Sequence, residues 1–321
     1  MRFGYVLSGE EYTPAQLVEQ ARLAEEAGFE CLWISDHFHP WNDQQGQSPF
    51  VWSMIGAISQ ACDLPVTTAV TCPTYRIHPA IIAQAAATSA VLLEGRFVLG
   101  LGSGEALNEH ILGDAWPTAD RRLARLEEAV EVIRKLWTGE QVNHHGEFFT
   151  VDTARIYTLP DEPPPIYISG FGPQATDLAA RIGDGYVTTT PDTDLLQRFR
   201  EKSGGKPAQI GLKAAWADTE TEAVDHAHRL WANAGVPGEL AQVLPNPTHF
   251  EQASTLVTKQ QTADAVPCGP EVAAHVRAAM PAVEAGFDEV YVANMGPHYA
   301  DMIRAYGREV LPQLREAAGR A

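Results

Sequence analysis

The residue best placed to do chemistry is His37, which follows a short apolar run. The run from Cys31 to Ile34 is typical of a buried strand, and Asp36 and His37 come where such a strand would emerge at the rim of a barrel. Polar groups at such a rim are often functional, because the strand holds them rigidly beside open space. An imidazole near a carboxylate and Trp41 could move a proton beside a flat ligand. A hydrogen-bonded structural histidine and a packed tryptophan are the alternative interpretation.

A second polar group follows another apolar run. Glu105 comes after a glycine-rich turn, and Asn108 lies one helical turn later on the same side. A carboxyl and an amide that point the same way suit proton transfer to a ring nitrogen and hydrogen bonding to it. The turn lacks the third glycine of a dinucleotide-binding fingerprint, and a tight turn with a solvated Glu105 is the alternative.

Three further segments give weaker signals. Gly172 to Ala175 begin a helix directly after an apolar run, and free N–H groups at a helix start bind phosphate or carboxylate, although a plain capped loop fits equally well. Cys72 has no thiolate-stabilising neighbours in the sequence, so a packed cysteine is favoured over a nucleophile. His144 and His145 have no cysteine nearby, so we place them on the surface of a hairpin and predict no metal site.

The composition excludes several classes of protein. The 321 residues include 41 acidic and 23 basic ones, and a net charge of −18 argues against nucleic acid or an anionic membrane as a partner. The four cysteines are scattered, which indicates a reducing compartment. No apolar run is long enough to span a bilayer, and the first residues are typical of a strand rather than a signal peptide. We therefore expect a cytoplasmic protein.

The elements that must position these residues alternate between short apolar runs and longer amphipathic segments. The expected strands are at 3–7, 31–34, 66–70, 97–101, 166–169, 185–188, 210–217 and 289–293, and the expected helices are at 13–27, 49–61, 80–93, 121–137, 174–182, 194–202, 222–231, 271–285 and 299–318. Eight such units, with polar residues repeatedly after the strands, favour an α/β fold of the (β/α)8 TIM-barrel type over a doubly wound sheet. Within a single domain of residues 1–321, we expect a hairpin excursion at 141–165 and an insertion near the substrate pocket at 233–267.

Several motifs occur in a fixed order along the chain: Ser35 to Phe38 with Pro40 and Trp41, Pro73 to Arg76 with Pro79, Gly102 to Glu109, Gly172 with Pro173, and Gly183 to Gly185. Together they resemble the luciferase-like family of barrel oxidoreductases. They are most similar to its branch that uses the deazaflavin coenzyme F420, typified by coenzyme F420-dependent glucose-6-phosphate dehydrogenase. The resemblance covers residues 1–200 well. It implies an eight-stranded barrel, usually a homodimer, with the coenzyme at the C-terminal rim of the strands.

The resemblance also implies roles for single residues. His37 would take the proton of a substrate hydroxyl, Glu105 would supply a proton to the reduced ring, and Trp41 would flank the developing charge. A non-prolyl cis peptide, which the family has in the third strand, would fall at Ala69–Val70. The positions that match those contacting the coenzyme are Asp36, Ala69, Val70, Cys72, Ser103, Gly104, Asn108, Gly170, Phe171, Gly172, Gln174 and Ala175.

The substrate pocket departs from that of the sugar-phosphate enzymes in this branch. They have a basic residue shortly after strand six, where this chain has Asp192, and two further basic positions fall near Gln252 and Thr262. Losing three cations and gaining an anion makes a phosphorylated substrate a poor ligand. We expect a neutral alcohol or a less charged sugar, rather than glucose 6-phosphate, in contact with Trp41, Thr189 and Asp192.

Three other functions stay open at this point. The first is a reductase that uses reduced coenzyme F420 on a carbonyl or an activated alkene. The second is a flavin (FMN)-dependent monooxygenase of the same fold, and the third is a carrier that binds the deazaflavin without turnover. The dehydrogenase is favoured, because a deazaflavin does not activate oxygen readily and a paired His37 and Glu105 exceed what a carrier needs.

Overall fold

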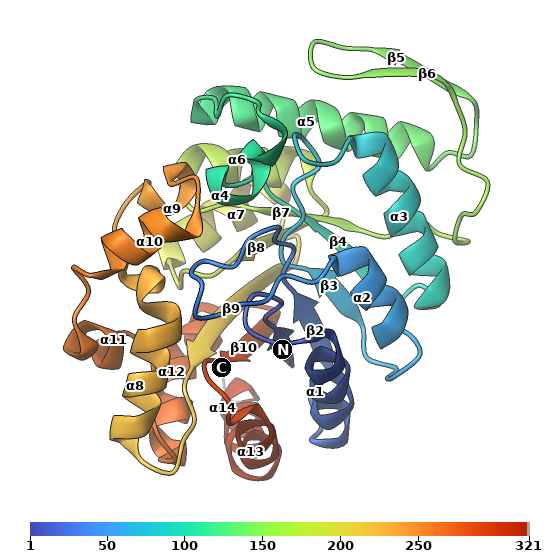
Figure 1. Cartoon of the computed structure of the whole chain (residues 1–321). Helices are drawn as coiled ribbons and strands as arrows, with labels where there is room; N and C mark the ends of the chain where they lie inside the picture. Colours follow the sequence, from blue (N-terminus) through green and yellow to red (C-terminus); the bar gives the residue numbers. More distant parts are fainter. Residues whose placement is uncertain (320–321) are drawn as a thin grey trace.

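The eight expected strands close into one parallel barrel in the computed structural model, which describes residues 1–319 (Figure 1). Around the barrel the strand order is β1, β10, β9, β8, β7, β4, β3, β2. The predicted (β/α)8 fold is therefore confirmed. The strands are β1 (Arg2–Leu7), β2 (Cys31–Ile34), β3 (Val66–Thr68), β4 (Phe97–Leu101), β7 (Ile166–Ser169), β8 (Gly185–Thr188), β9 (Ala208–Ala214) and β10 (Glu289–Asn294).

Helices surround the strands as an outer ring (Figure 1). The sequence explains where helix α1 begins. Thr13 and Gln16 form a capping box at its start, and a proline occupies its first turn. No helix among residues 1–319 has the length and apolar character needed to cross a membrane. The main helices are α1 (Pro14–Glu26), α2 (Val51–Ile58), α3 (Pro79–Leu92), α5 (Ala119–Leu136), α6 (Pro173–Ile182), α7 (Thr193–Ser203), α8 (Glu220–Trp231), α12 (Val272–Ala285), α13 (Tyr299–Ala305) and α14 (Leu311–Ala318).

Aromatic rings fill the interior of the barrel in spaces that glycines leave. The ring of Trp33 on β2 stacks on that of Tyr291 on β10, with centroids 4.4 Å apart. A Cβ atom on Gly4 would lie 2.3 Å from the Tyr291 ring, and one on Gly211 would lie 2.3 Å from the Trp33 ring. The alternate residues of these strands face the helices, as the period of two requires. The interior is thus a packed core that holds the strand ends rigidly.

Many elements differ from the sequence-based expectation by a few residues at their ends, and the helix expected at 49–61 is only α2 (Val51–Ile58). Strand β3 ends at Thr68, and the Ala69–Val70 peptide that follows is cis, as the resemblance implied. Strand β9 ends at Ala214, and beyond it Ala215 forms only an isolated bridge to Cys268. The closing helix is interrupted by the π-helical turn η3 (Tyr306–Val310), where Gly307 approaches α1 so closely that an added Cβ would lie 2.4 Å from the carbonyl oxygen of Ala27.

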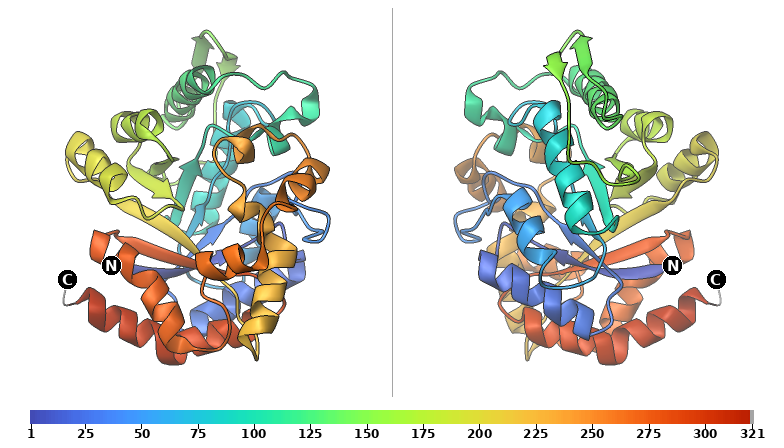
Figure 2. Two further views of the ribbon diagram at one scale, coloured as in Figure 1. Left: turned by 90° about the vertical axis from the view of Figure 1, so that its left-hand side faces the viewer. Right: turned by 90° about the vertical axis from the view of Figure 1, so that its right-hand side faces the viewer.

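The segment after α5 forms a hairpin of β5 (Val142–His145) and β6 (Thr150–Ala154), which projects beyond the helices (Figure 2). The prediction that both histidines lie on its surface is wrong for His144, which is buried, while His145 is exposed. Nε2 of His144 lies 3.1 Å from a carboxylate oxygen of Glu128 on α5. That carboxylate also accepts the backbone N–H groups of Phe148 and Phe149, so it fastens the hairpin to the helix.

Short helices fill the segment between α8 and α12. They are η2 (Ala232–Gly235), α9 (Leu240–Val243), α10 (Pro247–Ser254) and α11 (Lys259–Ala265). Asn246 caps α10 and Thr258 caps α11 through their side chains. Phe250 on α10 is fully buried and packs edge-on against Trp41, with ring centroids 5.0 Å apart. The segment therefore covers the loop that follows β2.

Candidate active site

The site is built around His37, which follows β2 at its C-terminal end. Nδ1 of His37 lies 3.1 Å from the carbonyl oxygen of His39. Nε2 lies 3.3 Å from Oε1 of Glu10 and 3.8 Å from Oε2 of Glu105. Nδ1 lies between the His39 carbonyl, which accepts, and Nδ2 of Asn108, which donates and is 3.1 Å away, so either neutral tautomer is satisfied there. Nε2 can therefore hold or release a proton between the two carboxylates.

Glu10 is a residue of this site that the sequence analysis missed. It follows β1, and its Oε2 accepts the hydroxyl proton of Ser35 at 2.7 Å, while Ser35 Oγ accepts the backbone N–H of Gly9 at 2.8 Å. These bonds hold the carboxylate against His37. The signal that could have found it is its position, because Gly9 and Glu10 follow the first strand just as the other rim residues follow theirs.

Glu105 and Asn108 come together as their spacing predicts. Glu105 is the N-cap residue of the short helix α4 (Ala106–Glu109). The amide nitrogen Nδ2 of Asn108 lies 3.4 Å from Oε2 of Glu105, and its oxygen accepts the backbone N–H groups of Phe38 and His39 at 2.9 and 3.2 Å. Asn108 thus ties the loop after β4 to the loop after β2 and brings Glu105 beside His37.

The environment of Glu105 adjusts its acidity. Burial raises the pKa of Glu105 to about 7, a change that nearby His37 opposes and the charge of Glu10 reinforces. Its side chain keeps 31% of its surface exposed, so solvent or a ligand can reach it. A carboxyl group that titrates near neutral pH can donate or accept a proton under physiological conditions.

Lys213 on β9 is a second residue that the sequence analysis missed. Its ammonium group lies 4.2 Å from the ring centroid of Trp231. Burial lowers the pKa of Lys213, and the charges of Glu10 and Glu105 oppose this effect. The signal that could have identified Lys213 in the sequence is a single lysine within an apolar strand. Its positive charge offsets the carboxylates of the site.

Asp36 belongs to a buried ionic network beneath these groups. Its Oδ2 accepts the hydroxyl proton of Thr71 at 2.7 Å, and its Oδ1 pairs with Nη2 of Arg76 at 2.8 Å. Glu109 accepts the backbone N–H of Arg76 at 2.9 Å. Burial alone would lower the pKa of Arg76, but the charges of Asp36 and Glu109 outweigh it and raise that pKa.

The positions matched to the coenzyme fall into two groups, of which the first lies where the loops after β3 and β4 meet. A Cβ on Gly102 would lie 2.7 Å from Cγ2 of Val70, and one on Gly104 would lie 2.6 Å from Sγ of Cys72. Gly104 also has a φ of +86°. Burial raises the pKa of the Cys72 thiol well above its ordinary value, which supports a packed cysteine.

The second group forms the start of α6. Its N-cap is Gly172, which has no side-chain cap, and a Cβ there would meet nothing within 4 Å. Gly170 packs closely on the first turn, since a Cβ there would lie 3.0 Å from the backbone nitrogen of Thr176. Phe171 is exposed, as is Gln174, whereas Ala175 is partly buried. Uncapped N–H groups facing open space fit an anionic group such as a phosphate.

Of the three residues expected to contact the substrate, only Trp41 lies against His37. The rings of Trp41 and His37 have centroids 5.0 Å apart. Thr189 is exposed, and Asp192 caps α7 by accepting the backbone N–H of Leu195 at 2.9 Å. Within residues 1–319, no hydrogen bond or ring contact joins Thr189, Asp192 or the start of α6 to His37.

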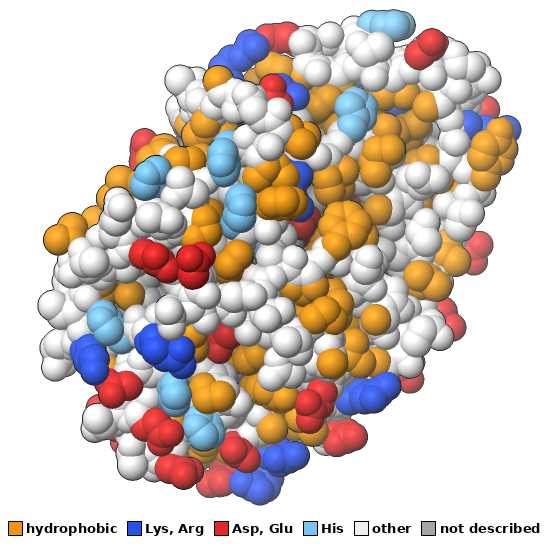
Figure 3. Space-filling view, in the orientation of Figure 1, with side chains coloured by type: hydrophobic (Ala, Val, Ile, Leu, Met, Phe, Trp, Pro, Cys, Tyr) orange, Lys and Arg blue, Asp and Glu red, His pale blue; other side chains and the backbone are white. Residues whose placement is uncertain are grey.

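The positions where cations would bind a phosphate are not cationic. Thr262 is buried with Oγ1 3.3 Å from Nδ1 of His228. The ammonium of Lys259, the nearby candidate to replace a lost cation, pairs with Asp225 at 2.6 Å on the surface. Hydrophobic side chains gather over the middle of the face seen in Figure 3, while many of the acidic and basic side chains lie toward its edges.

Comparisons with known proteins agree with this geometry. The family described as luciferase-like monooxygenase matches residues 1–266. An F420-dependent glucose-6-phosphate dehydrogenase of Nakamurella multipartita is 36% identical over 99% of this chain and 98% of its own. An F420-dependent hydroxymycolic acid dehydrogenase of Mycobacterium tuberculosis is 35% identical over 97% of this chain and 88% of its own.

One solved structure is similar over nearly the whole molecule. An F420-dependent secondary alcohol dehydrogenase in complex with an F420-acetone adduct superposes with a TM-score of 0.90 and 32% identity, over 98% of this chain and 99% of that one. The residues matched by the family model hold seven of the eight barrel strands and every residue of the site around His37. The chain therefore belongs to the luciferase-like monooxygenase family.

Proposed function

We propose that this protein is a coenzyme F420-dependent dehydrogenase that oxidises a neutral alcohol or a hydroxyl of an uncharged sugar. The observation that supports it most directly is the pairing of His37 with Glu105, whose Oε2 lies 3.8 Å from Nε2 of the imidazole. The names of relatives with 36% and 35% identity over nearly the full chain support the coenzyme.

A deazaflavin held here would supply the two-electron chemistry, by taking hydride from the carbon that bears the hydroxyl. Nε2 of His37 accepts the hydroxyl proton, and Glu10, 3.3 Å away, stabilises the imidazolium that results. Glu105, with a pKa of about 7, holds an exchangeable proton on the other side of the imidazole. The ring of Trp41, with its centroid 5.0 Å from that of His37, flanks the imidazole on which the positive charge develops.

The chain offers matching contacts for the coenzyme. The amide of Asn108 and the loop of Ser103 and Gly104 lie beside Glu105, where the reactive ring would bind. The uncapped start of α6 suits the phosphate of its tail. The three substrate positions without cations favour a neutral substrate over a phosphorylated one. We also propose, from the family resemblance, that the protein is a cytoplasmic homodimer.

A two-part experiment tests the proposal. The purified protein is first titrated with oxidised coenzyme F420 and separately with FMN, while the fluorescence of its tryptophans is followed. The coenzyme's visible absorbance is then followed with a panel of neutral alcohols and sugars. We expect tight binding of F420 and loss of its absorbance with a neutral alcohol.

The variants His37→Ala and Glu105→Gln separate catalysis from binding. Each should lower kcat by about 10²–10⁴-fold, the range for loss of a general acid or base, while the dissociation constant of F420 changes little. Unchanged rates with intact binding would instead identify a carrier. Tighter binding of FMN, with consumption of oxygen, would replace the proposal by a flavin monooxygenase.

A further inference from the structure

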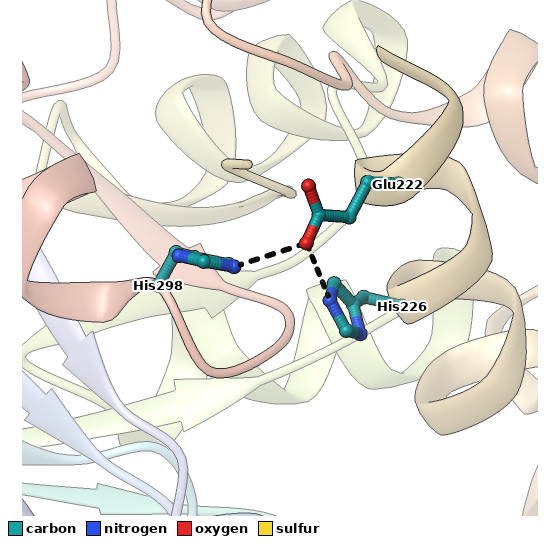
Figure 4. A group of neighbouring side chains, drawn as sticks. All are labelled: Glu222, His226 and His298. Atoms are coloured by element: carbon teal, nitrogen blue, oxygen red, sulfur yellow. Dashed lines mark ion pairs between the residues drawn. The ribbon is translucent and has the colours of Figure 1, made fainter. Parts of the chain in front are cut away.

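Three side chains of the types that bind metal ions converge on the rim of the barrel, apart from the site around His37. Glu222 and His226 lie one turn apart on α8, and His298 is the N-cap residue of α13 (Figure 4). Nε2 of His226 lies 3.7 Å from Oε1 of Glu222, and Nε2 of His298 lies 3.5 Å from the same oxygen. The three ligand atoms all lie within 4.8 Å of one another.

These separations suit a bound ion better than direct hydrogen bonds. Hydrogen bonds between nitrogen and oxygen span about 2.7–3.2 Å, and both distances at Glu222 exceed this range. A tetrahedral zinc ion bound about 2.0–2.1 Å from each ligand atom keeps its ligands about 3.3 Å apart. Both observed separations lie within about 0.4 Å of that value. The third separation, between the two imidazole nitrogens, is at most 4.8 Å, so the imidazoles would rotate toward each other when an ion binds.

The two elements that hold these ligands are packed tightly against each other. Gly296, in the loop before α13, has a φ of +109°, and an added Cβ would lie 3.0 Å from Cβ of His226. The backbone N–H of Gly296 also donates to Glu11 at 2.7 Å, and Glu11 accepts the indole N–H of Trp231 on α8 at 2.6 Å. The spacing between α8 and this loop is thus set without any metal.

We propose that Glu222, His226 and His298 form a binding site for a divalent transition metal ion of the zinc class. Two imidazoles and one carboxylate are a typical zinc ligand set, and such three-ligand sites leave a fourth position for water. All three side chains are partly exposed, so an ion can enter from solvent. The bound ion would join α8 to the loop before α13. The proposal does not depend on the coenzyme or on the reaction at His37.

Two charged neighbours affect how tightly the ion binds. Oδ2 of Asp301 lies 3.8 Å from Nδ1 of His298, beyond hydrogen-bond distance, and its negative charge favours a cation nearby. Nη2 of the exposed Arg229 lies 3.4 Å from Nδ1 of His226. A guanidinium can only donate, and even a weak contact of this length favours neutral His226 with its proton on Nε2, where the metal must bind. Arg229 therefore opposes metal binding, both by this tautomer and by its charge.

The experiment uses untagged protein that has been freed of metal with a chelator. Titration calorimetry with zinc chloride should give one ion per chain, and addition of Co²⁺ should give the intense visible absorption of a tetrahedral site. Glu222→Gln, His226→Ala and His298→Ala should each weaken zinc binding by roughly 100-fold or more, since losing a group that only hydrogen-bonds to a metal ligand already costs about 10–100-fold. His145→Ala, at an exposed histidine of the hairpin, is the matched control and should bind as the unmodified protein does.

Arg229→Ala gives an independent test with the opposite sign, because it should tighten zinc binding. Zinc should also raise the Tm of the unmodified protein, more so at higher concentration, and not that of Glu222→Gln. Absence of stoichiometric binding, or binding that the three ligand variants leave intact, would overturn the proposal. Glu222→Gln is nearly isosteric and Glu222 is partly exposed, so we expect this variant to fold. Its Tm in the absence of metal checks that it is folded.

Discussion

Glu10 and Lys213 show why a site can be only partly read from single residues. His37, Glu105 and Asn108 were found because each follows a strand or a glycine turn in a pattern that marks the rim of a barrel. Glu10 became relevant only when β1 and β2 were placed side by side, which brings it to 3.3 Å from His37. Lys213 reaches the site from β9, on another part of the barrel. Contacts between distant strands depend on the closure of the barrel, which local spacing does not give.

The acidity of Glu105 leads to a prediction about pH. Burial raises its pKa to about 7, so the carboxyl is protonated below that pH and loses its proton above it. If the reaction needs the protonated form to supply a proton, kcat should fall as the pH rises above about 7. The measurement is a kcat profile at saturating coenzyme and alcohol, with Glu105→Gln as the matched variant. We expect this decline to disappear in Glu105→Gln; the same decline in that variant would assign it to another group.

Among the elements, the short strands were the most predictable. The runs at 31–34, 97–101, 166–169 and 185–188 match β2, β4, β7 and β8 residue for residue, because a parallel strand covered on both faces is a continuous apolar run. The closing helix was expected to be continuous, and η3 interrupts it where Gly307 packs on Ala27. The helices α9 to α11 are too short for a periodic pattern to emerge.

The loops that follow β2, β3 and β4 are joined by the ionic network of Arg76, which gives a prediction about stability. Arg76→Met would leave Asp36 and Glu109 buried without their partner, and we expect it to lower the free energy of unfolding by about 3–5 kcal/mol. Burial already raises the pKa of Glu109 beside Arg76. Without the guanidinium, which opposes this rise, the carboxyl of Glu109 should take up a proton more readily in the folded state. The loss of stability should therefore be smaller at low pH and grow as the pH rises.

Urea unfolding of Arg76→Met at acidic and at mildly alkaline pH measures both effects. The control is Arg277→Met, because Arg277 pairs with Glu271 at 3.5 Å on the surface, where both side chains are mostly exposed. Its effect should stay within about 1 kcal/mol, as for other surface pairs, and should vary little with pH. Equal losses in the two variants would show that the buried network does not hold these loops together.

At the scale of the whole molecule, the fold and the family followed from the sequence because they rest on many independent features. Eight βα units and several motifs in a fixed order all pointed to one barrel, so errors of a few residues at the ends of β3 and β9 did not matter. The prediction of a neutral substrate rests on fewer features. It depends on three positions in loops and in a segment of short helices, and on the charge of the molecule around them.

That charge leads to a prediction that compares a neutral alcohol, chosen as the best substrate in the panel, with its phosphate monoester. The net charge of −18 and the absence of cations at Asp192, Gln252 and Thr262 should repel the ester. At saturating coenzyme, kcat/KM for the ester should be lower and should rise with salt between about 0.01 and about 0.1 M, as the screening length shortens from about 30 to about 10 Å. The value for the neutral alcohol should not change. Asp192→Asn keeps a residue able to cap α7 and removes one negative charge, so it should favour the ester alone. Equal kcat/KM for the two compounds at low salt would mean that the site binds phosphate through other groups, and that the neutral substrate proposed for this protein is wrong.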